Sequence, residues 1–341
     1  MRHPRTAVAF ASPDGAVVPA PGWRGLRLPA EALHDLELAL KRQLKRYRRA
    51  LKRCQQKFSP AAVHESRVQT RRLLALVQLL QPFLPAGHIR KAEVALKRHL
   101  DTFDDLRDTQ MQRLEVAKMR PEFRAAGTFY KYLEDREARF TRRSRKRIKR
   151  IKSKRLRELV SACRQDVKKW RGLHTVAKAN RMLLTAINRA FGQARKLRDK
   201  IDGHDTASIH RTRVAFKKFR YMVENLAGGL PFARERRLAA MRDYQAMMGD
   251  IQDAEVLLRT LDKFLLKQTV EASEARRFRA EWVRRRHRLV VAYLHAAGRL
   301  DDFWPTAGPS ASREQQRAAP APPESPPAAP AQEITDTSES L

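Results

Sequence analysis

The sequence predicts an all-α protein, a duplicated pair of antiparallel four-helix bundles with long helices. Three observations lead to this fold class. Segments with helical periodicity and few glycines run from Glu31 to Leu300. Prolines stand at the segment boundaries, where they start or stop helices. Two motifs of the first half recur in the second half, and the short connections favour antiparallel neighbours within each half.

The helices follow from the apolar period and its interruptions. The expected helices are residues 31–57, 60–81, 88–118 and 121–172 in the first half, and 175–202, 206–227, 233–267 and 272–297 in the second. Pro60 starts one of these segments, Pro82 and Pro85 close it, and Pro121 and Pro231 start two others.

Two terminal stretches fall outside this pattern. Residues 1–29 are rich in Pro, Gly and Ala without periodicity, so we expect a flexible leader. Residues 306–341 are Pro-rich, of low complexity and mildly acidic, which predicts a disordered tail. The helical domain then spans residues 30–300, with halves at 30–173 and 174–300.

Charge indicates the class of partner. The 341 residues include 72 Lys and Arg against 37 Asp and Glu, a formal net charge of +35. Self-repulsion of this size calls for counter-anions, so a nucleic acid, an anionic membrane surface or a phosphate polymer is expected. Cys54 and Cys163 have no paired or metal-binding spacing, which fits a reducing cytoplasm. No apolar run is long enough for a transmembrane helix.

The duplication is clearest in two marker segments. "AVHESRVQTRRLLALVQLL" (62–80) aligns with "SIHRTRVAFKKFRYMVENL" (208–226), and "DDLRDTQM" (104–111) aligns with "GDIQDAEV" (249–256). The aligned pairs are His64 with His210, Arg67 with Arg213, Arg71 and Arg72 with Lys217 and Lys218, Asp108 with Asp253, and Lys97 with Arg242. Two segments at nearly one offset make chance similarity improbable.

The first marker segment carries a basic face in each copy. His210, Arg213, Lys217 and Arg220 fall within an arc of roughly 80° of a helix, opposite an apolar stripe. In the first copy His64, Arg67 and Arg71 fall within about 60°. One such face alone is equally consistent with a solvated surface. Two matching faces favour an anion-binding groove, which forms if the two halves pack with these faces together.

The motifs "VHESRVQTRR" and "IHRTRVAFKKFRY", each followed by an aspartate-bearing "LRD" or "IQD" segment, resemble the CHAD family, the conserved histidine α-helical domains. The resemblance covers about residues 30–300. It implies two four-helix bundles related by pseudo-twofold symmetry. It also implies binding of inorganic polyphosphate in a basic central groove, and association with polyphosphate granules in the cytoplasm.

The resemblance also implies which residues bind. They are His64, Arg67, Arg71, Arg72, His210, Arg213, Lys217, Lys218 and Arg220, and we add the duplicated pair Lys97 and Arg242. The sequence departs from the family pattern at Leu74, where an arginine is usual, so the first half is expected to bind a ligand less tightly. It also departs at Asp104, where the second copy keeps Gly249. Asp108 and Asp253 are expected to pair with arginines and support the basic face.

Other functions are weaker alternatives. Cations flank His64 and His210, which opposes a metal site, and no cofactor is expected. Phosphoanhydride hydrolysis needs clustered carboxylates, of which "DTFDD" (101–105) is the nearest case, and no Gly-rich phosphate loop occurs. We therefore expect a binding protein, with a metal-dependent phosphohydrolase as a minor alternative.

Non-specific nucleic-acid binding is the main competing function, because charge alone does not separate polyanions. Stacking of bases needs exposed aromatic side chains, and aromatics make up only 7% of the chain. A further basic run at residues 139–157 is left open between a solvated arm and an added anion-binding surface.

Overall fold

The computed structural model describes residues 26–267 and 271–305, and these residues form helices and short connections. The ten α-helices of this part of the chain are α1 Ala32–Gln56, α2 Pro60–Leu79, α3 Ala86–Asp101, α4 Asp104–Met119, α5 Arg124–Lys149, α6 Ser153–Leu173, α7 Val176–Arg198, α8 Thr206–Leu226, α9 Glu235–Leu265 and α10 Ala272–Ala296. Short 3₁₀ helices follow α2 (Gln81–Phe83), α8 (Ala227–Gly229) and α10 (Ala297–Phe303). The all-α class is thus confirmed.

Two of the long helices expected in the first half are each divided into two shorter helices. The segment expected at 88–118 divides at Thr102 and Phe103 into α3 and α4. Phe103 is fully buried, and Ser144 of α5 donates a hydrogen bond of 2.8 Å to the carbonyl oxygen of Thr102. The break therefore inserts an aromatic ring into the core while an outside donor satisfies the backbone. In the second half α9 continues unbroken for 31 residues.

The segment expected at 121–172 divides in the same way, within the basic run. α5 ends at Lys149 and α6 begins at Ser153. The Gln55 side chain donates to the carbonyl oxygens of Ile148 and Ile151, at 3.0 and 2.9 Å, and Ile148 is fully buried. The basic run is helical on both sides of this anchored turn, so it is not a free arm.

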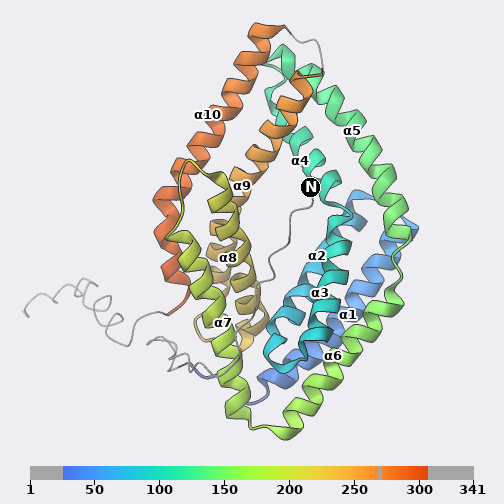
Figure 1. The fold of residues 1–341 in the computed structure, drawn as a ribbon, viewed down its shortest axis with the longest axis vertical. Coiled ribbons are helices and arrows are strands. Elements are labelled where there is room, and N and C mark those ends of the chain that lie inside the picture. Colours follow the sequence, from blue (N-terminus) through green and yellow to red (C-terminus); the bar gives the residue numbers. More distant parts are fainter. Residues whose placement is uncertain (1–25, 268–270, 306–341) are drawn as a thin grey trace, which may run out of the picture.

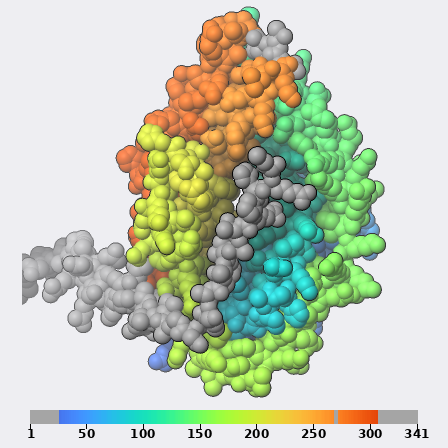
Figure 2. Space-filling view, viewed as in Figure 1, coloured from blue at the N-terminus to red at the C-terminus, as the bar shows by residue number. Residues whose placement is uncertain are grey.

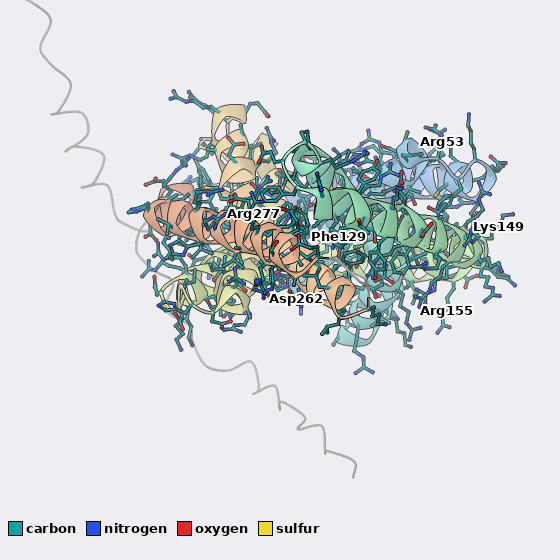
Figure 3. The ribbon with its side chains drawn as sticks, turned by 90° about the horizontal axis from the view of Figure 1, so that it is seen from above. Arg53, Phe129, Lys149, Arg155, Asp262 and Arg277 are labelled. Carbon is teal, nitrogen blue, oxygen red and sulfur yellow. The ribbon has the colours of Figure 1, made fainter. Side chains whose placement is uncertain are left out.

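The helices form two groups that lie beside each other and meet at both ends of the view (Figure 1). α1, α2, α3 and α6 pack together in the first half, and α7, α8, α9 and α10 in the second. The halves meet through contacts of α2 with α8, of α4 with α9 and of α5 with α10. A large apolar core joins the two bundles, and a smaller core around Phe129 lies where α4, α5, α9 and α10 come together (Figures 1 and 3).

The ends of the domain lie slightly outside the predicted boundaries. The leader and tail predicted at 1–29 and 306–341 lie outside the described residues, except for residues 26–29. Leu28 is buried, and Asn180 donates a hydrogen bond of 2.9 Å to its carbonyl oxygen. At the other end Trp304, beyond the expected boundary at 300, is also buried. None of the described helices is both long and apolar enough to cross a bilayer.

Trp304 is expected to be a major contributor to stability. It is 1% exposed, its ring packs edge-on against Phe219 and Phe232, and its Nε1 donates to Asn188 Oδ1 at 3.2 Å. We predict that Trp304→Ala lowers the free energy of unfolding by about 3–5 kcal/mol, measured by chemical denaturation. Leu266→Ala, at a side chain that is 87% exposed, serves as the control and should change it by less than about 0.5 kcal/mol. Equal denaturation midpoints for wild type and Trp304→Ala would contradict the prediction.

Candidate functional site

The basic faces are carried by α2 and α8, which begin in similar ways. Ser59 caps α2 by accepting a hydrogen bond of 3.3 Å from the amide of Ala62, and Pro60 occupies the first turn. Asp205 caps α8 by accepting one of 2.9 Å from the amide of Ala207. Each cap fixes where its helix begins, and with it the direction of the side chains one to four turns later.

The two basic faces meet in the middle of the molecule, because α2 packs against α8. Lys217 of α8 lies among Arg213 and Arg220 of its own helix and Arg67 and Arg71 of α2. Burial, followed by repulsion from these arginines with Arg71 first, lowers the pKa of Lys217 to about 7. The structure thus brings cations from both halves together with too few internal anions to balance them.

A groove of about 650 Å³ opens beside this cluster. We call it the basic groove, and its arginines are Arg42 and Arg46 of α1, Arg71 and Arg72 of α2, Arg220 of α8 and Arg242 of α9. Elements of both halves therefore contribute to one surface. In the space-filling view the cyan helices of the first half and the yellow helices of the second lie on opposite sides of one face (Figure 2).

The matched arginines Arg67 and Arg213 differ in their partners. Arg67 is 6% exposed and donates from Nη1 to Asp104 Oδ1 at 3.0 Å. At the matching position Gly249 leaves room, since a Cβ there would lie 3.6 Å from Arg213 Nε. Arg213 Nε is buried and has no hydrogen-bond partner among the described residues. One guanidinium is therefore neutralised within the protein, and its counterpart retains unused donor capacity.

Arg220 is held firmly in place. It is 7% exposed, its Nε donates to Gln245 Oε1 at 2.9 Å, and its Nη1 forms an ion pair with Glu224. Its guanidinium carbon also lies 4.4 Å from the ring centre of Tyr221. Arg220 therefore presents a fixed charge at the wall of the basic groove, with part of that charge offset by Glu224.

The remaining predicted binding residues differ in their exposure and in their position relative to the basic groove. Arg72 and Lys218 are exposed, and Arg242 lines the basic groove while pairing with Glu235. His210 lies near Arg213 and Lys217, and burial, then Arg213, lowers its pKa. His64 is exposed on α2.

Lys97 is not among the residues that line the basic groove. It is exposed on α3, where it pairs with Glu93 at 3.3 Å. Its sequence counterpart Arg242 does line the groove, so the aligned positions occupy different surroundings.

The expected pairing of Asp108 and Asp253 with arginines is not found within residues 26–267 and 271–305. Asp104 is the carboxylate that pairs with Arg67. Asp108 and Asp253 instead line a separate acidic cavity. Burial, then Asp104 and Asp253, raises the pKa of Asp108 to about 6. Their influence on the basic face is electrostatic, since Arg107 and Arg213 lie near Asp253.

Three arginines of the site were missed in the sequence. Arg42 and Arg46 line the groove from α1, and Arg107 lies near Arg67, Arg213 and Asp253. Arg107 stands inside the duplicated "DDLRDTQM" segment, which was a usable signal. Arg42 and Arg46 are one helical turn apart among many other cations of α1, so their spacing does not distinguish them.

Chemically, the groove offers guanidinium and ammonium donors. Arg and Lys carry no acceptor and bind oxyanions through charge-assisted hydrogen bonds, with two-pronged contacts available from Arg. Within the described part of the chain, no three His, Cys, Asp or Glu side chains are positioned to hold a metal ion. The arrangement therefore suits a ligand with many negatively charged oxygens.

The family model of the CHAD domain matches residues 38–262. The chain belongs to the CHAD domain family. It is similar to the crystal structure of the CHAD domain from the plant Ricinus communis, with a TM-score of 0.57 and 18% identity over 85% of this chain and 98% of that one. It is also similar to PptA from Streptomyces chartreusis, with a TM-score of 0.55 and 15% identity over 80% of this chain and all of that one.

At these identities the two structures support the fold of this CHAD protein and nothing finer. No curated protein sequence matches the chain. The family assignment confirms the resemblance that its two basic motifs indicated.

The lowered pKa of Lys217 leads to a direct test. Because Arg71 is the strongest of the charges that lower it, Arg71→Gln should raise the pKa of Lys217 above about 7. Arg72→Gln removes the same charge from the next residue, which is exposed, and should leave this pKa unchanged. Heteronuclear NMR of the lysine Cε–Hε groups measures both.

The same shift sets a pH dependence of stability. Lys217 has a pKa of about 7 in the folded protein against 10.5 for a free lysine, so the unfolded chain holds more protons between these values. Its contribution to the free energy of unfolding therefore rises with pH across this window. An equal shift of the Lys217 pKa in both Arg→Gln variants would contradict the arrangement of charges described above.

Proposed function

We propose that this CHAD protein binds inorganic polyphosphate in the basic groove and the adjoining cluster of Arg71, Arg213 and Lys217. The observation that carries the proposal is the meeting of basic faces from both halves on one surface. A linear phosphate polymer places a charge on every unit and therefore matches a continuous row of cations. The family resemblance implies the same ligand.

The groove suits phosphates better than bases. Tyr221 is the aromatic residue that lines it, and the guanidinium of Arg220 covers its ring at 4.4 Å. Phe216 and Phe219 of the same helix are fully buried. Sequence-tolerant binding of single-stranded nucleic acid depends on aromatic rings open to stacking, and the described groove offers no uncovered one. These features support a ligand without bases.

We further propose that binding is not followed by turnover, and that it directs the protein to polyphosphate granules. Glu224 is the carboxylate that lines the basic groove, and Arg220 already engages it. A carboxylate held in that way is poorly placed to act as a general base. The groove therefore has the composition of a binding surface.

Competition between polyanions tests the ligand class. Labelled polyphosphate bound to the full chain is challenged with duplex DNA and with RNA at equal phosphate concentration and fixed salt, because affinity for any polyanion varies steeply with salt. We expect polyphosphate to be retained against both. Displacement by nucleic acid at equal phosphate would replace the proposal with the nucleic-acid alternative.

The asymmetry between Asp104 and Gly249 tests the site itself. Gly249→Asp places a carboxylate beside Arg213, and we expect affinity for polyphosphate to fall about tenfold or more, since a charge-assisted contact contributes about 1.5–3 kcal/mol. Asp104→Asn releases Arg67 and should strengthen binding. Equilibrium titration with labelled polyphosphate measures both effects.

Gly249→Ala is the matched control for this pair. It adds the Cβ, which would lie at ordinary contact distance from Arg213, but no charge, and it should bind as the wild type does. If Gly249→Asp and Gly249→Ala weaken binding equally, space and not charge at Arg213 is what matters. If Gly249→Asp binds normally, Arg213 does not contact the ligand.

A further inference from the structure

A second concave site is lined by α4, α9 and α10, and it shares no lining residue with the basic groove. This cavity has a volume of about 220 Å³ and is partly open. It is far larger than the ~10–15 Å³ that one water requires, so it accommodates a ligand of several heavy atoms. We call it the acidic cavity, because its charged lining consists of Asp108, Glu115, Asp250, Asp253 and Arg285.

The charges in the acidic cavity are not balanced from within. Arg285 forms an ion pair with Glu115, which also accepts from Lys118. In residues 26–267 and 271–305, Asp108, Asp250 and Asp253 have no ion-pair partner. Burial is the first cause that raises the pKa of each of them, and repulsion from neighbouring acids adds to it for Asp108 and Asp250. Nearby arginines, among them Arg107 and Arg213, oppose the rise in part. A bound cation would remove this repulsion.

A neutral group in the same lining also lacks a partner. Gln112 is 4% exposed; its Nε2 donates to Thr260 at 3.1 Å, and its Oε1 has no partner among the described residues. A buried amide oxygen without a donor costs free energy. An N–H donor on a ligand would satisfy it. Trp282 Nε1 is likewise buried without a partner, and an ammonium group does not satisfy that donor.

The rest of the lining decides between an inorganic and an organic cation. Among the described residues, no three His, Cys, Asp or Glu side chains are positioned to hold a metal ion. Leu257, Leu289 and Trp282 add apolar surface to the lining. A lining that combines carboxylates with apolar side chains matches a short alkyl chain with an ammonium group at each end.

We propose that the acidic cavity binds a small aliphatic diamine, with its ammonium groups contacting Asp108 and Asp250 and its methylene chain lying against Leu257 and Trp282. Each ammonium group carries three N–H donors and no acceptor. One ammonium group therefore has donors to spare for Gln112 Oε1 as well as for a carboxylate. This site is separate from the basic groove and does not depend on the function proposed for it.

Calorimetric titration of the full chain with 1,4-diaminobutane, in a buffer without phosphate or other amines, tests the proposal. We expect saturable binding at one site per chain and none with 1,4-butanediol, which keeps the length and lacks the charges. Asp250→Asn and Asp108→Asn should each weaken binding about tenfold, which is the effect of losing one good contact. Both variants keep the side-chain size, and thermal unfolding checks their fold.

Asp135→Asn is the matched control, because Asp135 is an exposed acid of α5 outside the cavity. It should bind the diamine as the wild type does. The proposal is overturned if the diamine shows no saturable binding, or if the two cavity variants bind as tightly as the control. Displacement of the diamine by Mg²⁺ at equal concentration would show an inorganic cation site and would overturn the organic class of ligand.

Discussion

Repulsion among like charges is the constraint around which this molecule is built. Arg67, Arg71, Arg213 and Lys217 come from two different helices and are held together by apolar packing on the opposite faces of those helices. The hydrophobic contacts of the two bundles therefore offset this repulsion, and burial together with the neighbouring arginines lowers the pKa of Lys217. A site assembled in this way is organised before the anion arrives, so binding does not have to order it.

The protein balances this repulsion unequally in its two halves. Asp104 neutralises Arg67, and Glu224 offsets Arg220. Arg213 instead faces Gly249, and its Nε has no partner in the part of the chain that the structure describes. If carboxylates neutralised every arginine, the fold would be more stable but no cation would be left to bind a ligand. If no arginine were neutralised, repulsion would destabilise the contact between α2 and α8. With this partial neutralisation, the cations that are least balanced by carboxylates lie where α2 and α8 meet.

The sequence was informative where one helix carries the whole signal. The faces of α2 and α8 follow from spacing alone, and their caps at Ser59 and Asp205 agree with it. The break at Phe103 was not predictable, because the apolar period continues on both sides and the reason for the break lies in the core and in Ser144. The role of Asp104 and the groove position of Arg42 depend on distances between helices, which no local pattern records.

The first half has two helices, α3 and α4, where the second half has the single helix α9, and this difference affects stiffness. α9 has 31 residues and at ~1.5 Å per residue is about 46 Å long, so it acts as a single stiff beam between the larger and the smaller core. The first half spans the same distance with a joint at Thr102 and Phe103. The two halves therefore differ in stiffness along this direction, because only the first half has a break there.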